Sequence, residues 1–264
     1  MIPSPDILLS IVIPAYNEER RLPGTLDELV AHCRRFPFSW EVIVVVERST
    51  DQTVERASEI AARHEEISVI VNQVKRGKGY ALRTGVGMSS GEIVLTMDAD
   101  LSVPAEFIDA FVSYLEANPS VDVLVGNRRH PDTVIEVRQS RLRQVLGHVF
   151  SRLVRVLSAS ALTDTQCGFK ALRRNAAMEI YARQTVDGFA CDVETLLLAE
   201  RLGFVVRDLP VRWANSPESK VRIVRDSLHM LWDVLRIRWK VSRSLARTPF
   251  RAHSREEAAE QRKA

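Results

Sequence analysis

Short runs rich in Val, Ile and Leu alternate with longer amphipathic stretches through the first half of the chain. This alternation is typical of βαβ units, in which a helix follows each strand and returns over the sheet. The expected fold is therefore α/β, with a mostly parallel central sheet flanked by helices. The pattern predicts strands at 8–15, 41–46, 67–72, 92–97 and 121–125, and helices at 22–35, 53–64, 79–88 and 104–118.

The length of 264 residues and the hydrophobic content of 45% allow a substantial buried core. This length is more than one typical domain needs and less than two usually take. We expect a single domain over residues 1–242, with a first half at about 7–126 and a second half at about 127–242. The charged segment 243–264 is poor in large apolar residues, so we expect it to form a tail outside this domain.

The net charge is only +3, but the basic residues are clustered. Segment 128–155 contains arginines at 128, 129, 138, 141, 143, 152 and 155 against two acidic residues, and the chain from Lys220 onward is also basic. Such clusters indicate an anionic partner, which could be phosphate, nucleic acid or an acidic membrane surface. A nucleic-acid role is disfavoured because no recognised motif or array of aromatic side chains accompanies the charge.

The cysteines and the apolar runs indicate the cellular compartment in which this protein is expected. Cys33, Cys167 and Cys191 are widely spaced, which fits neither a disulfide framework nor a zinc site. A reducing compartment is therefore expected. The first residues lack the pattern of a signal peptide, and no run of about 18 apolar residues occurs. We expect a cytoplasmic protein without a spanning helix.

Two carboxylates, Asp98 and Asp100, follow the apolar run 92–97 directly. If that run is a buried strand, they stand at the edge of the sheet where open α/β folds bind ligands. Mg²⁺ and Mn²⁺ prefer oxygen ligands and often bridge one or two carboxylates to substrate phosphates. The alternative is a solvated turn, because Asp is also a common turn residue.

Two further segments lie where loops should meet that edge. Asn17 and two acidic residues follow the first strand, and they could line a pocket for a base or ribose or simply cap the next helix. In Arg76-Gly77-Lys78-Gly79, the glycines would let the backbone approach a ligand while Lys78 supplies positive charge. The spacing is not that of a P-loop, and no Gly-x-Gly-x-x-Gly follows the first strand.

Two segments of the second half predict basic amphipathic helices, at 142–157 and 221–241. Each combines an apolar stripe with interleaved arginines. Such a stripe is more often a core face than a membrane face. Helices of this composition can also lie in a membrane interface with their basic side chains toward anionic headgroups.

Six motifs occur along the chain in a fixed order: Ile13-Pro14-Ala15-Tyr16-Asn17-Glu18-Glu19, Arg76-Gly77-Lys78-Gly79, Asp98-Ala99-Asp100, Asp164-Thr165-Gln166-Cys167-Gly168-Phe169-Lys170, Asp192-Val193-Glu194 and Ser219-Lys220. Their order resembles that of glycosyltransferase family 2, and more closely its dolichyl-phosphate or polyprenyl-phosphate β-glucosyltransferase branch. The resemblance covers nearly all of 8–240. It implies a GT-A fold, a nucleotide-sugar donor such as UDP-glucose, Mg²⁺ or Mn²⁺, and a polyprenyl-phosphate acceptor.

The resemblance assigns donor-side roles in the first half. The implied nucleotide-sugar residues are Pro14, Ala15, Tyr16, Glu18, Glu47, Lys78, Asp98, Ala99, Asp100 and Gln166. Asp98 and Asp100 would hold the metal at the diphosphate, and Gln166 would border the sugar or hold its own loop together. The Asp-Asp-Gly-Ser element of the family is replaced here by Val46-Glu47-Arg48-Ser49. Glu47 could accept a hydrogen bond from a base N–H, with the base shifted.

On the acceptor side, the resemblance implies five residues that bind the lipid phosphate: Arg128, Arg138, Arg141, Ser219 and Lys220. A guanidinium suits this task because it can bind two phosphate oxygens at once. The alternative is that these arginines are ordinary solvated ion-pair partners. Asp192, together with Glu194, occupies the position of an acceptor-side acid, with catalysis, sugar binding or arginine orientation as possible roles.

The implied reaction is a single inverting displacement by the acceptor phosphate, with Asp98, Asp100 and Asp192 as the catalytic residues. A membrane-resident acceptor would explain the two basic amphipathic helices as peripheral attachment to the cytoplasmic face. Two alternatives stay open: a soluble family 2-like enzyme with a small acceptor, and a nucleotide-sugar-binding protein with weakened catalysis. The sequence does not specify the oligomeric state.

Overall fold

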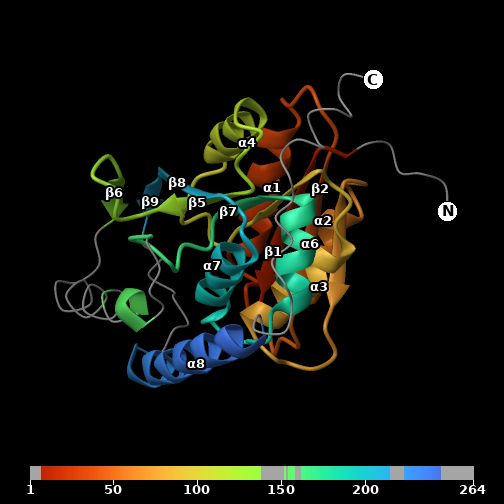
Figure 1. Ribbon diagram of the computed structural model, residues 1–264. Coiled ribbons are helices and arrows are strands. Elements are labelled where there is room, and N and C mark those ends of the chain that lie inside the picture. The colour runs from red at the N-terminus through yellow and green to blue at the C-terminus, as the bar shows by residue number, and fades with distance from the viewer. Residues whose placement is uncertain (1–6, 138–151, 153, 158–161, 215–222, 245–264) are drawn as a thin grey trace.

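The structure is a computed structural model that describes residues 7–137, 152, 154–157, 162–214 and 223–244. One twisted seven-stranded sheet forms its centre, with helices on both faces (Figure 1). The strands follow the order β3-β2-β1-β4-β7-β5-β8. They are β1 (Leu9–Ala15), β2 (Trp40–Val46), β3 (Ile67–Val71), β4 (Ile93–Thr96), β5 (Val123–Asn127), β7 (Lys170–Arg173) and β8 (Val206–Pro210). The expected α/β class with a mostly parallel sheet is confirmed.

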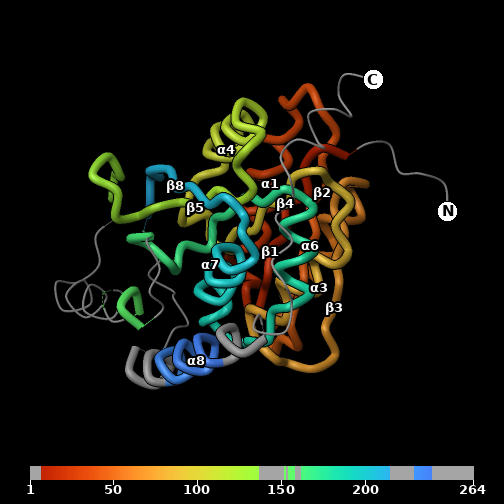
Figure 2. The backbone as a smooth tube through the Cα atoms, in the orientation of Figure 1, coloured from red at the N-terminus to blue at the C-terminus, as the bar shows by residue number. Residues whose placement is uncertain are grey.

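Helices connect these strands and cover the sheet. They are α1 (Leu22–Cys33), α2 (Thr53–Ala61), α3 (Lys78–Met88), α4 (Phe107–Ala117), α6 (Arg174–Arg183), α7 (Cys191–Leu202) and α8 (Ile223–Ser244). Helices α3, α6 and α7 pack in a row, and α8 lies against α7 (Figures 1 and 2). A small parallel sheet of β6 (Val134–Val137) and β9 (Arg212–Ala214) stands beside the main sheet. Among the described residues, no helix is both long enough and apolar enough to cross a membrane.

The central strands are buried on both faces, which explains their continuous apolar sequences. Every residue of β1 except Pro14 is buried, and every residue of β2 except Glu41 is buried. Successive side chains of a strand point to opposite faces, so a strand covered by helices on both sides needs apolar residues throughout. On one face, Val12 and Val45 approach so closely that a Cβ at Gly85 of α3 would lie 2.4 and 2.9 Å from their methyl groups.

Strand β7 determines which loop lies at the carboxyl edge of β4 and β5. It runs antiparallel between β4 and β5, with Lys170 opposite both Thr96 and Val125. A strand that begins where its two neighbours end brings its preceding loop to their carboxyl edge. The 162–169 segment therefore lies beside Asp98, which follows β4. Periodicity along the sequence does not predict the reversed direction of this strand.

Most element boundaries agree with the sequence prediction within three residues, and two findings differ. Helix α1 starts at Leu22 with Arg21 at its N-cap, so Asn17 does not cap it. Instead Asn17 takes a left-handed conformation (φ 54°), and its side chain exchanges hydrogen bonds with Thr50. The predicted helix 142–157 falls mostly outside the described residues, as do Arg138, Arg141, Ser219, Lys220 and most of the tail 243–264. The proposed domain limits stay predictions.

Candidate active site

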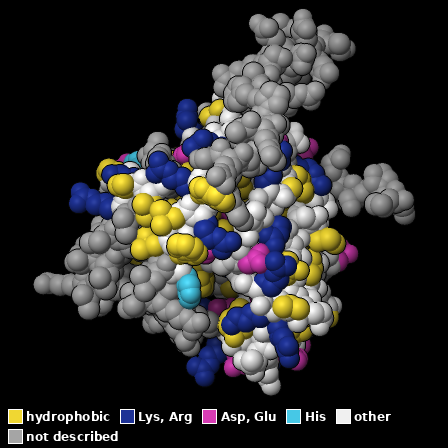
Figure 3. Space-filling view, turned by 60° about the horizontal axis from the view of Figure 1, so that its bottom comes forward, with side chains coloured by type: hydrophobic (Ala, Val, Ile, Leu, Met, Phe, Trp, Pro, Cys, Tyr) yellow, Lys and Arg dark blue, Asp and Glu magenta, His cyan; other side chains and the backbone are white. Residues whose placement is uncertain are grey.

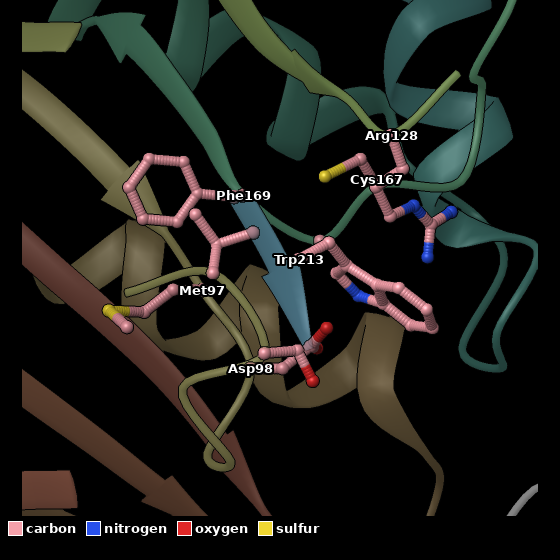
Figure 4. A pocket seen from close by; sticks show the side chains of 9 residues that line it. Met97, Asp98, Arg128, Cys167, Phe169 and Trp213 are labelled. Atoms are coloured by element: carbon pink, nitrogen blue, oxygen red, sulfur yellow. The ribbon is translucent and has the colours of Figure 1, made fainter. Parts of the chain in front are cut away.

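A small pocket opens at the carboxyl edge of the sheet, where the segments after β4 and before β7 meet (Figure 4). The side chains of Asp98, Trp213 and Arg128 lie next to one another around it. Its lining comes from elements far apart in the sequence: Met97, Asp98, Ser102, Val103, Arg128, Cys167, Gly168, Phe169 and Trp213. Burial raises the pKa of Cys167 to about 11, so its thiol is neutral at physiological pH.

The carboxylate of Asp98 lies next to Lys78 and Gly168. Its Oδ1 lies 2.8 Å from Nζ of Lys78, and its side chain is 45% exposed. Burial would raise the pKa of this carboxyl, but Lys78, together with the more distant Lys170 and Arg128, keeps the pKa below its usual range. A Cβ at position 168 would lie 2.4 Å from Oδ2 of Asp98, so only glycine leaves room for the carboxylate there.

Asp100 faces a different cation. Its Oδ2 accepts a hydrogen bond from Nη1 of Arg21 at 3.3 Å, and its Oδ1 accepts from the backbone N–H and hydroxyl of Ser102. Arg21 is fixed in turn by Glu18, whose two carboxylate oxygens accept at 2.7 and 2.6 Å. Leu101, between these contacts, has a left-handed backbone (φ 49°). Asp100 is therefore oriented by a network that begins at the predicted nucleotide motif.

The two carboxylates provide the hard oxygen donors that Mg²⁺ or Mn²⁺ requires. Within the described part of the chain, no group of three or more His, Cys, Asp or Glu side chains is arranged to hold a metal. This is consistent with a metal that takes its remaining oxygens from substrate phosphates and water, as Mg²⁺ commonly does. Asp98 and Asp100 are thus the residues that fit such an ion.

A continuous chain of charges extends inward from Asp98. Nζ of Lys78 also lies 2.9 Å from Oδ2 of Asp192, and Oδ1 of Asp192 accepts a hydrogen bond from the ammonium of Lys170. Burial would lower the pKa of Lys78, but Asp192 and Asp98 raise it well above the usual value. Both oxygens of Asp192 therefore contact lysines. In this arrangement the carboxylate positions Lys78, which favours a supporting role over that of an acceptor-side base.

Lys170 ends the 164–170 motif, and its role was not predicted from the sequence. Its side chain is fully buried at the start of β7 and also donates to the carbonyl of Cys167. A buried lysine needs a partner, since burial of an unpaired charge is very unfavourable. The available signal was a lysine at the start of an apolar strand, which predicts a buried ion pair but not its partner.

Glu47 has a clear structural role. It is 2% exposed, and its Oε2 accepts hydrogen bonds from the backbone N–H groups of Arg76 and Gly77 at 2.6 and 2.9 Å. Its Oε1 accepts from the side chain of Asn72 at 2.8 Å. The carboxylate thus holds the turn that leads to Lys78. Its predicted hydrogen bond to a nucleotide base stays a prediction.

The glycines of the 76–79 turn approach protein backbone, where the sequence analysis expected a ligand. Gly77 has φ 129°, and a Cβ there would lie 2.5 Å from the carbonyl oxygen of Asp187. That same carbonyl accepts from the N–H groups of Gly79 and Tyr80 at the start of α3. Glu194 holds the Asp187 loop by accepting hydrogen bonds from Thr185 and Val186. Glu194 therefore stabilises the loop whose Asp187 carbonyl binds the start of α3.

The predicted nucleotide residues at the end of β1 include one half-buried aromatic side chain, Tyr16. Nζ of Lys75 lies 3.5 Å from its ring centroid. The carbonyl of Ala15 accepts from the N–H of Glu47, while Pro14 is half-buried in the strand. Ala99 is buried, and its carbonyl accepts from the hydroxyl of Thr25. Contact of these residues with a nucleotide stays a prediction.

Arg128 is fixed by an internal ion pair. Its Nε and Nη2 donate to Asp164 at 2.7 and 2.9 Å, and its backbone N–H donates to the same carboxylate. Burial would raise the pKa of Asp164, but Arg128 outweighs it and lowers the pKa to about 2. The guanidinium also lies 5.8 Å from the ring of Trp213. Gln166 is half-buried, with its N–H on Asp164, and its side chain does not line the pocket.

Comparison with known proteins decides the family. Residues 10–181 match the family described as glycosyl transferase family 2. The chain belongs to glycosyltransferase family 2. Its fold agrees with the GT-A architecture expected from the sequence resemblance.

Two sequence relatives of this family 2 glycosyltransferase are dolichyl-phosphate beta-glucosyltransferases. The dolichyl-phosphate beta-glucosyltransferase of Homo sapiens is 34% identical over 246 residues, which cover 89% of this chain and 76% of the human protein. A dolichyl-phosphate beta-glucosyltransferase of Trichomonas vaginalis is 31% identical over 226 residues, covering 83% of this chain and 67% of its own length. The predicted branch of the family is therefore confirmed.

Among solved structures, this family 2 chain is similar to glucosyl-3-phosphoglycerate synthase from Mycobacterium tuberculosis, in a complex with Mn²⁺, UDP-glucose and phosphoglyceric acid. The TM-score is 0.64 at 20% identity, and the match covers 89% of this chain and 79% of the synthase. At this identity, the likeness establishes the shared fold.

Proposed function

We propose that this enzyme transfers glucose from UDP-glucose to the phosphate of dolichol or a similar polyprenol, with inversion at the anomeric carbon. The observation that carries the proposal is that Asp98, after β4, and Arg128, after β5, line the same pocket. Asp98 can bind the metal at the donor diphosphate, and Arg128 can bind the anionic acceptor. The names of the sequence relatives support the sugar and the lipid.

The donor site is proposed at the ends of β1 and β4. Asp98 and Asp100 would hold Mg²⁺ or Mn²⁺, which, when bound, stabilises the negative charge of the departing nucleoside diphosphate. Lys78 lies close enough to Asp98 to contact the same diphosphate. Its position is set by Asp192 on one side and by the Glu47-held turn on the other. Tyr16 and Glu18 stand at the nucleotide end.

The acceptor site is proposed around Arg128, which is partly exposed and locked by Asp164. The hydrogen bonds to Asp164 use Nε and Nη2, so the two N–H groups of Nη1 lie outside that pairing. A phosphate monoester has a second pKa of about 6, so the acceptor is largely ionised near neutral pH. Such a nucleophile needs orientation more than a strong base. This agrees with the pairing of Asp192 with two lysines.

A membrane surface is the proposed location, through α8. Val234 and Ile237 are fully buried, whereas Trp232 and Trp239 are 63% and 58% exposed on another face of the helix. Arg236 and Arg238 are exposed beside them, and Figure 3 presents this side of the molecule, where hydrophobic and basic side chains stand together. Exposed tryptophans flanked by arginines favour the interface of an anionic bilayer. Cytoplasmic peripheral attachment is therefore the proposed location.

Two alternative functions can be distinguished from the proposed one. A small phosphorylated acceptor is supported by the fold neighbour that contains phosphoglyceric acid. The exposed tryptophans of α8 favour the lipid instead. A nucleotide-sugar-binding protein with weakened catalysis is disfavoured because Asp98, Asp100 and Lys78 are all in place.

A transfer assay with two acceptors tests the proposal. Radiolabelled nucleotide sugars, including UDP-glucose, are incubated with Mg²⁺ or Mn²⁺ and either dolichyl phosphate or phosphoglyceric acid. Label in the organic phase that is lost in Asp100→Ala and kept in Arg63→Met, an exposed position in the turn after α2, supports the lipid acceptor. Label transferred only to phosphoglyceric acid favours the small acceptor, and donor binding without transfer favours the binding protein.

A further inference from the structure

Each carboxylate of the Asp98-Ala99-Asp100 motif contacts a cation of the protein itself. Asp98 Oδ1 lies 2.8 Å from Nζ of Lys78, and Asp100 Oδ2 lies 3.3 Å from Nη1 of Arg21. These two cations come from different elements, α3 and the turn before α1. One oxygen of each carboxylate that fits a divalent metal is therefore already engaged by a cation in the described structure.

Both cations also have a second anion that does not belong to the motif. Lys78 is 2.9 Å from Asp192, which Lys170 holds in place, and Arg21 donates two hydrogen bonds to Glu18. Each cation can therefore leave its aspartate without becoming an unpaired charge in a half-buried site. That is the arrangement expected of a displaceable partner, since removing the sole partner of a buried charge is strongly unfavourable.

A divalent cation should bind this site less favourably alone than together with a diphosphate. Alone, the metal must approach two carboxylates that each have a positive group within 3.3 Å, and like charges repel. A diphosphate supplies new oxygens for Lys78 and Arg21 and further oxygens for the metal. The carboxylates then become available to the ion.

We propose that Lys78 and Arg21 act as displaceable internal counterions, which make divalent-cation binding depend on the nucleoside diphosphate. The proposal rests on the donor site of the proposed function, but not on the sugar or the acceptor. Because linkage is reciprocal, the metal must tighten the nucleotide by the same factor as the nucleotide tightens the metal. Couplings of this kind commonly amount to about 5- to 150-fold.

Titration calorimetry of Mn²⁺ without and with saturating UDP tests the proposal. In the wild type, UDP should tighten Mn²⁺ binding by about tenfold or more. In Lys78→Met, Mn²⁺ alone should bind more tightly than in the wild type, and the additional tightening by UDP should shrink. Arg21→Met should show the same change through Asp100. Arg63→Met removes one exposed positive charge away from the site, so it should behave as the wild type.

The proposal is overturned if Mn²⁺ binds the wild type equally well with and without UDP, a result that needs no variant to fold. It is equally overturned if Lys78→Met and Arg21→Met, with intact melting transitions, keep the wild-type affinity for Mn²⁺ alone. In either case, continued transfer of glucose to dolichyl phosphate would leave the proposed function standing. If neither Mn²⁺ nor UDP binds, the coupling and the donor site both fail.

Discussion

The ammonium of Lys170 is fully buried and donates to Oδ1 of Asp192, whose other oxygen lies 2.9 Å from Nζ of Lys78. One carboxylate therefore links a lysine of the core to a lysine that reaches Asp98 at the pocket. Stability and the geometry of the donor site depend on the same ion pair. Changes at Lys170 should consequently affect substrate binding although this residue does not line the pocket.

Replacement of Lys170 by methionine should destabilise the fold by about 3 kcal/mol, because removal of one partner from a buried pair leaves the other poorly compensated. Asp192 keeps Lys78, which limits the loss. Urea unfolding followed by circular dichroism measures the effect. The double variant Lys170→Met, Asp192→Leu should lose less than the sum of the single variants. Additive losses would contradict the paired role.

The Arg128–Asp164 pair predicts a specific dependence of stability on pH. The pKa of Asp164 is about 2 in the fold, below the ordinary value of 3.8. A lowered carboxyl pKa contributes stability above pH 3.8 that is lost as pH falls toward 2, here about 2 kcal/mol. The difference in unfolding free energy between the wild type and Asp164→Asn should shrink by that amount between pH 5 and pH 2. A constant difference would refute the assignment.

Glu47→Ala should weaken donor binding without touching the metal ligands. The change removes the acceptor of the Arg76 and Gly77 N–H groups, so the turn before Lys78 loses its fixed position. Loss of a buried acceptor costs about 1–3 kcal/mol. We expect KM for UDP-glucose to rise about tenfold with a smaller change in kcat. Glu41→Ala, at the opposite end of β2, is the control, and an equal rise there would remove the special role of the turn.

The aromatic ring of Trp213 should contribute to kcat/KM. The indole lines the pocket beside Asp98, and the Arg128 guanidinium lies 5.8 Å from it. Trp213→Ala should lower kcat/KM about tenfold, because a cation–π contact contributes about 0.5–2 kcal/mol and the pocket also loses its wall. Trp213→Phe should retain most of the activity. Equal losses in both variants would point to the indole N–H instead of the ring.

The α8 surface should bind vesicles that contain anionic lipid. Flotation with phosphatidylserine-containing liposomes should recover the wild type at low salt and lose the variant Trp232→Ala, Trp239→Ala. The matched control is Met88→Ala, which removes a side chain that is 64% exposed on α3. Binding should weaken with salt, because exposed charges are screened at high ionic strength. Equal recovery of both variants would exclude α8 as the attachment surface.

Local sequence patterns predicted the elements well, for a physical reason. Continuous apolar runs such as those of β1 and β2 are buried on both faces, and the helices between them follow from periodicity alone. The position of Asp98 and Asp100 at the sheet edge follows from the same local signal. Asn17 was harder to predict, since a residue that suits a helix cap also suits a left-handed turn.

The sequence by itself determined the α/β class, the family and the carboxylates after β4. Tertiary structure alone decided which charges meet: Lys78 and Asp192 are 114 residues apart, and Glu47 is 29 residues from Arg76. Strand and helix periodicities are local, whereas an ion pair depends on distances through space. The reversed strand β7 adds Lys170 and its loop to the edge where Asp98 lies, and there Lys170 meets Asp192.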